Sequence, residues 1–283
     1  MFQVQFEETE EAKELLSTLT KTMSSSLFMD GIEILHNDKT VSIRYPNEGY
    51  EDCLHLFKNS LKAFIIGYKK EKWFEKLLEQ QYYYDEAEER HQILSILHSI
   101  LEGEREDIEL LPYIDENEIL EEILQEFLCQ QPSFFFESFE MFRLKSYFEH
   151  LMKYLDVAID EYKMEQEYQA FVHMLRDFLK GRESKYKKIF LVDQDGFQFF
   201  IEGGRQLKRS ELAKIIDRKL VTNHPIYIDS VTIAPLISIA PEEVQVFTDN
   251  IEQGMVVTLK NIFEEKLTVY PLKSYPYQEQ VNH

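Results

Sequence analysis

The hydrophobic and polar positions of this chain change their period along its length. Residues 2–6 alternate apolar and polar side chains, as a half-buried strand does, and residues 31–35 and 40–45 alternate again. Residues 10–23 instead repeat apolar side chains at helical spacing. The first 46 residues are therefore predicted to form a small β-α-β-β unit. Its strands are too few to be stable alone, so they are expected to pack on helices or to join another sheet.

From residue 50 to residue 182 the apolar positions follow the 3.6-residue period of amphipathic helices. Asp115 stands where it can cap one of these helices. The longest run, 138–179, predicts either one long helix or two helices joined near 163–166, and Gly181 ends it. The middle of the chain is thus predicted to be a helical bundle.

Strand signals return in the last hundred residues. Residues 188–192 and 197–202 flank Asp193-Gln194-Asp195-Gly196, where the glycine supplies the positive φ of a hairpin turn. Ser210 is placed to cap a helix that continues to Leu220. The apolar segment 231–240 carries no charge, so it is expected to be a buried helix.

The end of the chain combines one more helix with two more strands. Asp229 is predicted to cap the apolar helix, and Asp249 or Asn250 to cap a helix over 250–264. Strands are expected at 244–248 and 267–272, with a frayed tail after Pro271. The predicted class is α+β and predominantly helical. It consists of an N-terminal β-α-β-β unit (1–46), a central helical bundle (47–183) and a C-terminal α/β domain with a small mixed sheet (184–283).

Composition narrows the biological setting. The 52 acidic and 31 basic residues give a net charge of −21, which favours solubility and repels bare nucleic acid and anionic membranes at long range. Cys53 and Cys129 are expected to be buried free thiols; two distant cysteines give no disulfide framework, which points to a reducing cytoplasm. The N-terminus shows no signal-peptide pattern, and no apolar run approaches the roughly 20 residues that span a bilayer.

Four segments of the C-terminal part carry a family resemblance. They are EYQAFVHMLRDFL (167–179), KKIFLVDQDGFQFF (187–200), IDSVTIAPLISIAPEEVQVF (228–247) and TLKNIFEEKLTVY (258–270). In these segments the chain resembles the sporulation protein YtxC family of endospore-forming Firmicutes. The resemblance implies a cytosolic protein linked to sporulation. It implies no catalytic residue, because the family has no assigned biochemical activity.

One stretch, 176–219, is basic in an otherwise acidic chain, with twelve basic and seven acidic residues. It could hold the phosphates of nucleic acid or a nucleotide, or it could complement acidic residues of the same molecule. We favour internal pairing, because no aromatic stacking motif accompanies the stretch. The candidate anion or nucleic-acid contacts within it are Arg182, Lys185, Lys187, Arg205, Lys208 and Arg209.

Other candidate sites are weaker. A calcium loop starting at Asp193 fails because its twelfth position is Gly204 rather than glutamate. The glycines of Glu202-Gly203-Gly204-Arg205 could cradle a phosphate, but no phosphate-binding motif surrounds them, and a flexible exit from the hairpin is favoured. His91 and His98 lie two helical turns apart, about 10 Å, too far to ligate one ion together.

The sequence therefore predicts no catalytic residue, cofactor or metal. The leading hypothesis is a non-enzymatic cytoplasmic protein that acts through contacts with an unidentified protein partner during sporulation. The alternative is nucleic-acid or nucleotide binding through 176–219. A third hypothesis, an unrecognised phosphate-handling enzyme, would need a polar cluster in a pocket. No membrane association is expected, and the sequence leaves the oligomeric state open.

Overall fold

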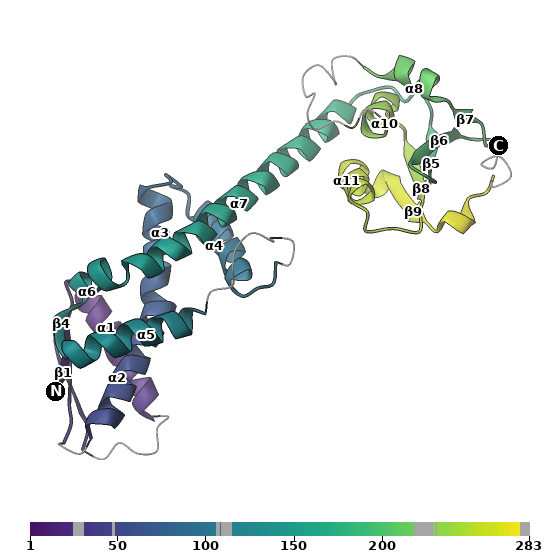
Figure 1. Cartoon of the computed structure of the whole chain (residues 1–283). Coiled ribbons are helices and arrows are strands. Elements are labelled where there is room, and N and C mark those ends of the chain that lie inside the picture. The colour runs from purple at the N-terminus through teal and green to yellow at the C-terminus, as the bar shows by residue number, and fades with distance from the viewer. Residues whose placement is uncertain are drawn as a thin grey trace. The chain divides into compact units, whose positions relative to one another are not determined.

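The computed structural model describes residues 1–24, 31–46, 49–105, 108, 115–217, 229 and 231–277 (Figure 1). Contacts divide the chain into two compact units, Met1–Lys163 and Met164–His283. The predicted class, α+β and predominantly helical, is confirmed: each unit combines helices with one small sheet. The three-part division at residues 46 and 183 stays a prediction.

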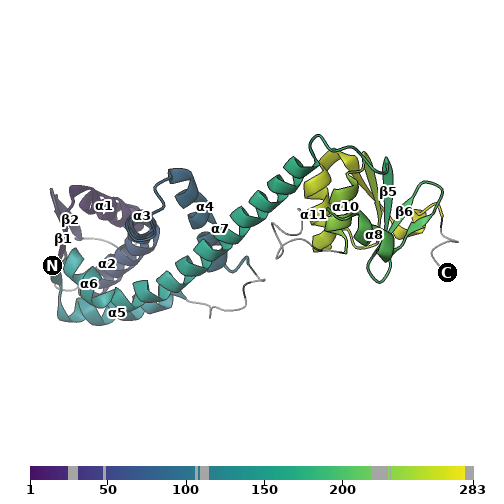
Figure 2. The ribbon, with the colours of Figure 1, turned by 90° about the horizontal axis from the view of Figure 1, so that it is seen from above.

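The first unit contains a four-stranded sheet of order β2-β3-β1-β4. β1 (Phe2–Gln5), β2 (Glu33–Asn37) and β3 (Thr40–Arg44) are antiparallel neighbours, with α1 (Thr9–Ser24) between β1 and β2 in the sequence. This is the predicted β-α-β-β unit. The sequence missed the fourth strand, β4 (Ser133–Phe135), which pairs with β1 in parallel. The helices lie on one side of this sheet (Figure 2).

The helices of the first unit enclose an aromatic core. Phe2 stacks on Phe57 with ring centroids 5.4 Å apart, and Phe6 stacks on Phe136 at 5.1 Å. Stacked phenylalanine rings thus join the sheet to the helices. The further helices that contribute to this unit are α2 (Tyr50–Phe64), the π-helix η1 (Ile65–Lys69), α3 (Lys70–Gln80), α4 (Ala87–Leu101), α5 (Glu116–Gln130), α6 (Phe136–Arg143) and α7 (Lys145–Leu179).

Two expectations about helix boundaries have different outcomes. Asp115 caps α5 as predicted, since its carboxylate accepts hydrogen bonds from the backbone N–H groups of Asn117 and Glu118. The run predicted over 138–179 does not break at 163–166. α7 continues through that point, and the interruption lies at Leu144, between α6 and α7.

The second unit is built on a five-stranded mixed sheet of order β7-β6-β5-β8-β9. β5, β8 and β9 are parallel, while β6 and β7 are antiparallel to their neighbours. The hairpin between β5 and β6 is confirmed, with Asp195 and Gly196 at positive φ. The strands are β5 (Lys188–Asp193), β6 (Phe197–Ile201), β7 (Gln206–Leu207), β8 (Glu243–Phe247) and β9 (Leu267–Tyr270).

Both faces of this sheet are covered. One face packs against α7, α8 (Arg209–Ile215), α10 (Ile233–Ile239) and α11 (Gly254–Phe263). Every residue of α10 is buried, as the uncharged sequence predicts, although Val231 before it is half exposed. The other face carries Phe190, Phe200 and Phe247, which pack against Tyr275 from the C-terminal segment.

Four local predictions are wrong. Ser210 does not cap α8: it lies inside the helix, which starts at Arg209 and ends at Ile215. Neither Asp249 nor Asn250 caps α11, which begins four residues later; the Asp249 carboxylate instead accepts a hydrogen bond from the backbone N–H of Leu272. The tail is not frayed as far as Tyr277, because it covers the sheet. Cys129 is exposed rather than buried.

Two further predictions concern residues at the edges of a segment that lies outside the described residues. Leu220, the predicted end of the Ser210 helix, lies outside the described residues. The Asp229 carboxylate accepts hydrogen bonds from the backbone N–H groups of Val231 and Thr232, so it fixes the turn that precedes α10. The helix itself begins at Ile233.

Candidate functional site

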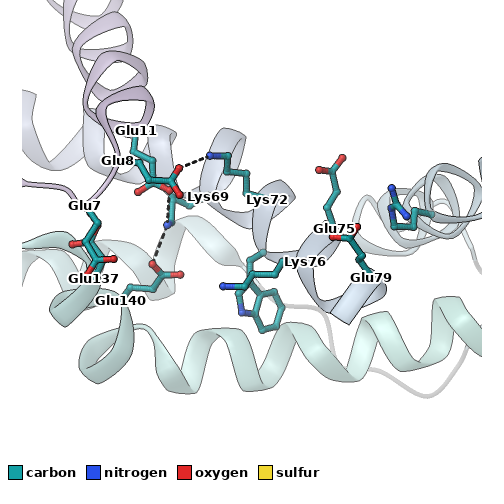
Figure 3. Close-up of a pocket in the computed structure, with 12 residues that line it drawn as sticks. Glu7, Glu8, Glu11, Lys69, Lys72, Glu75, Lys76, Glu79, Glu137 and Glu140 are labelled. Carbon is teal, nitrogen blue, oxygen red and sulfur yellow. Dashed lines mark hydrogen bonds and ion pairs between the residues drawn. The ribbon is translucent and has the colours of Figure 1, made fainter. Parts of the chain in front are cut away.

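A charged pocket of about 510 Å³ lies in the first unit (Figure 3). Its lining comes from the segment entering α1, from η1 and α3, from α4 and from α6. The residues of this acidic pocket are Glu7, Glu8, Glu11, Lys69, Lys72, Trp73, Glu75, Lys76, Glu79, Arg90, Glu137 and Glu140.

Lys69 is the central cation of the acidic pocket. Its Nζ lies 2.9 Å from Oε1 of Glu11 and 3.0 Å from Oε2 of Glu140, and it stands over the ring of Phe136. Lys69 is the last residue of the π-helix η1, a rare element that often marks a local functional or structural constraint. The cluster joins α1, η1 and α6 through one ammonium group (Figure 3).

The electrostatics of Lys69 argue against nucleophilic chemistry. Burial alone would lower the pKa of its ammonium group, but the Glu140 and Glu11 carboxylates outweigh burial and hold the pKa above its usual value. An activated lysine nucleophile needs the opposite shift, toward neutral pH. Lys69 therefore keeps its proton and acts as a permanent cation between two carboxylates.

The acidic pocket holds more carboxylate than this cation and its neighbour Lys72 can balance. Lys72 pairs with Glu8 at 3.3 Å, and Arg90 donates to the backbone carbonyls of Tyr84 and Asp85. Within the described part of the chain, no ion pair is formed by the carboxylates of Glu7, Glu75, Glu79 and Glu137. The pocket is consequently a negative surface open to a cationic group.

A second hollow, of about 620 Å³, continues from the acidic pocket and is mostly apolar. The two share Trp73, Lys76, Glu137 and Glu140. This apolar groove runs between α3 on one side and α6 with the first turns of α7 on the other. Its lining residues are Trp73, Lys76, Leu77, Gln80, Gln81, Glu137, Glu140, Met141, Lys145, Phe148, Glu149 and Met152.

Aromatic stacking fixes one part of the apolar groove, and flexible side chains form the rest. The rings of Trp73 and Phe148 stack with centroids 4.6 Å apart, which holds α3 against α7. Met141 on the wall of the groove is 66% exposed, and the neighbouring Phe142 is 76% exposed. Met141 and Phe142 are thus two large apolar side chains in contact with solvent.

The basic residues singled out from the sequence lie in the second unit, and all of them except Lys187 lie near one end of α8 or the other. Beyond its C-terminal end, Arg182 pairs with Asp217 at 2.5 Å, and Lys185 Nζ donates to the carbonyl of Ile215. These contacts place cations where the helix dipole is negative. The backbone carbonyl of the exposed Lys187 accepts hydrogen bonds from the N–H groups of Glu242 and Glu243.

The other three candidates lie near the start of α8. Arg205 pairs with Glu211 at 3.0 Å, and the second Glu211 oxygen accepts a hydrogen bond from the backbone N–H of Lys208. Arg209 is the exposed first residue of the helix. Three of the six candidates, Arg182, Lys185 and Arg205, are thus engaged with acidic side chains or a helix end. Nucleic-acid binding through them stays a prediction.

The weaker candidate sites have internal uses in the structure. The Gly204 N–H donates to the carbonyl of Ile201, and the Gly203 N–H donates to the hydroxyl of Tyr277. On α4, His98 pairs with Glu71 at 2.9 Å, while His91 is exposed. Among the described residues, no group of His, Cys, Asp and Glu side chains is arranged to hold a metal ion. The described helices also include none that is long and apolar enough to cross a membrane.

Sequence reasoning missed both the acidic pocket and the apolar groove. Trp73, Leu77 and Phe148 lie in the region that the sequence predicts to be helical, but the helical period does not show that α3 lies against α6 and α7. The sequence offers no signal of the groove at Met141, which lies between Phe139 and Phe142 in a helical pattern; only the structure shows that its side chain is exposed.

The comparisons with known proteins identify the family. The model of the YtxC-like family matches residues 55–268. The uncharacterized protein YtxC of Bacillus subtilis (strain 168) is 40% identical over 217 residues, which is 76% of each chain. The chain therefore belongs to the YtxC-like family, as the resemblance of its C-terminal segments indicates. No solved structure matches it significantly.

Proposed function

We propose that this chain is a non-enzymatic cytoplasmic protein that acts in sporulating cells by binding another protein. The observation that carries the proposal is the apolar groove with the exposed Met141 on its wall. Exposure of such a surface costs free energy in water, and a partner that covers it recovers that free energy. The link to sporulation is supported by the resemblance to a family of endospore-forming Firmicutes.

The charge arrangement supports binding rather than catalysis. Lys69 is neutralised by Glu11 and Glu140, and its raised pKa removes it as a nucleophile or base at neutral pH. The side chains of Glu75 and Glu79 are exposed on α3, where a partner can reach them. These groups suit recognition of a charged surface better than proton transfer.

The test is capture of the full-length chain, at its natural level, from sporulating cells. We expect one protein to be recovered reproducibly with the wild-type chain and lost with Met141→Asp. Met164→Asp is the matched control, because Met164 is also exposed, at 56%, but lies outside the groove. Repeated captures without any reproducible partner would overturn the proposed function. If Met141→Asp still captures the partner, the proposed function stands, but the binding surface lies elsewhere on the chain.

A further inference from the structure

The walls of the apolar groove limit the kind of partner it fits. Both walls are helices, whose backbone N–H and C=O groups are already hydrogen-bonded within the helix. A partner bound there gains no main-chain hydrogen bonds, so an extended strand would place unsatisfied polar groups against apolar side chains. A helix satisfies its own backbone and offers only side chains, which is the helix-in-groove mode of recognition.

The spacing of the lining residues favours the same kind of partner. Trp73 and Leu77 on α3 are four residues apart, and Phe148 and Met152 on α7 are also four apart. Such rows form ridges between which the side chains of a third helix can insert. Met141 and Met152 add adaptable surface, because methionine is unbranched and fills irregular gaps.

The charge around the groove defines the partner's polar side. The residues lining the acidic pocket and the apolar groove together include eight carboxylates and five cations. They are Glu7, Glu8, Glu11, Glu75, Glu79, Glu137, Glu140 and Glu149 against Lys69, Lys72, Lys76, Arg90 and Lys145. The surface therefore has a net charge of −3. A partner with Lys or Arg beside its apolar face complements it.

A second copy of this chain fits this surface less well than a different protein. The net charge of −21 makes two copies repel each other at long range. Some basic residues of the second unit are also already paired within the chain, Arg182 with Asp217 and Arg205 with Glu211. They are therefore less available to pair with the acidic pocket of a second copy.

We propose that the apolar groove binds a cationic amphipathic helix of a different protein. The apolar face of that helix lies on Trp73, Phe148 and Met141, and its Lys and Arg residues are attracted by the carboxylates of the adjoining acidic pocket, which Glu75 and Glu79 line. This inference rests on the proposed function and names the chemistry of its partner.

The chain contains its own probe for this binding. Trp73 is the single tryptophan, and it lines both hollows, so its emission reports directly on the groove. The probe ligand is a peptide of about 18 residues, roughly five helical turns, made of leucine and lysine with the leucines at helical spacing. One control peptide has the same composition in scrambled order, and the other replaces every lysine with glutamate.

The full-length chain is titrated with each peptide while the Trp73 emission is recorded. We expect a saturable blue shift with the leucine–lysine helix and weaker binding as salt is raised. The scrambled and glutamate peptides should leave the emission unchanged. Analytical ultracentrifugation of the chain without peptide tests for a second copy: a dimer that dissociates in Met141→Asp would overturn the choice of partner.

Matched charge reversals separate groove binding from general attraction to an acidic protein. Glu75→Lys/Glu79→Lys changes two exposed residues four apart on α3, and we expect it to weaken peptide binding about tenfold or more. Glu122→Lys/Glu126→Lys changes two exposed residues four apart on α5, with the same change in net charge. It should weaken binding by less than about threefold, as expected from long-range charge alone.

The outcomes distinguish this inference from the proposed function. No emission change with the leucine–lysine helix, or equal weakening by the two double variants, would overturn the cationic helix as occupant. The proposed function would still stand if a protein is captured from sporulating cells through Met141. Conversely, peptide binding without any cellular partner would support the groove's chemistry and contradict the cellular role.

Discussion

The indole ring of Trp73 and the phenyl ring of Phe148 stack with their centroids 4.6 Å apart. This contact joins α3 to α7, two helices that are separated in the sequence by α4, α5 and α6. It forms one part of the apolar groove, beside the unbranched side chains of Met141 and Met152. Trp73 fluorescence therefore reports both the folding of the first unit and the occupancy of the groove.

Replacing Lys69 with methionine should destabilise the first unit by about 3 kcal/mol, because it leaves buried carboxylate charge without its cation. The Lys69 and Glu11 side chains are only 11% and 7% exposed, so water cannot take over that role. Urea unfolding followed by Trp73 emission measures the loss. Lys72→Met is the control: its pair with Glu8 is exposed, and the change should cost less than about 1 kcal/mol. Equal losses would contradict the structural importance of the buried cluster.

The pair between His98 and Glu71 predicts a pH-dependent contribution to stability. The hydrogen bond from His98 lowers the pKa of Glu71, and the Glu71 carboxylate raises the pKa of His98. The Glu71 contribution is present above about pH 4.5 and is lost as pH falls; the His98 contribution is present below about pH 6.5 and is lost as pH rises through the raised pKa. The pair therefore stabilises the fold most between about pH 4.5 and 6.5.

An NMR titration of the His98 ring checks this pair. We expect a midpoint above the ordinary histidine value of about 6.5, and a return toward that value in Glu71→Gln. Glu102→Gln is the matched control, because Glu102 raises the pKa of His98 less than Glu71 does. A midpoint that does not respond to Glu71→Gln would show that the ion pair does not form in solution.

The two cysteines should differ sharply in reactivity. Burial raises the pKa of Cys53 to about 12, whereas Cys129 is exposed. A thiol reagent added to the native chain at about pH 8 should consume one equivalent rapidly, and the second only after unfolding. Cys129→Ser should remove the rapid phase. Two rapid equivalents in the wild-type chain would contradict the packing around α2.

Tyr275 offers a substitution that should stabilise the second unit. Its side chain is buried against Phe190, Phe200 and Phe247, and its hydroxyl finds no hydrogen-bond partner among the described residues. Tyr275→Phe removes that group and should raise stability by about 1 kcal/mol, while Tyr275→Ala should lower it by about 3 kcal/mol. Calorimetry of the full-length chain measures both changes. A destabilised Tyr275→Phe would show that the hydroxyl has a partner.

The sequence predicted those features that depend on neighbouring residues. Asp115 caps α5 because its carboxylate acts on N–H groups two and three residues away. The β5–β6 hairpin forms because Gly196 allows a positive φ at the turn. The uncharged α10 is buried because nothing in it gains from water.

The features that were missed depend on residues far apart in the chain. β4 is only three residues long and exists because Gln3 and its neighbours in β1 pair with it from 130 residues away. Tyr275 is held by a sheet face whose aromatic residues come from three strands. The apolar groove depends on the packing of α3 beside α6 and α7, which no local period encodes. The start of α8 also differs from the prediction. The Glu211 carboxylate, rather than the Ser210 hydroxyl, accepts a hydrogen bond from a backbone N–H there, that of Lys208.

The most direct test of the account places a photo-crosslinking phenylalanine analogue at position 141 of the full-length chain in sporulating cells, with position 164 as the control. We predict one protein adduct at position 141, none at 164, and loss of the adduct in Glu75→Lys/Glu79→Lys. The crosslinked partner peptide should carry apolar residues at intervals of three and four, flanked by Lys and Arg. No adduct at position 141, or the same adducts at both positions, would contradict the assignment of the groove as a protein-binding surface.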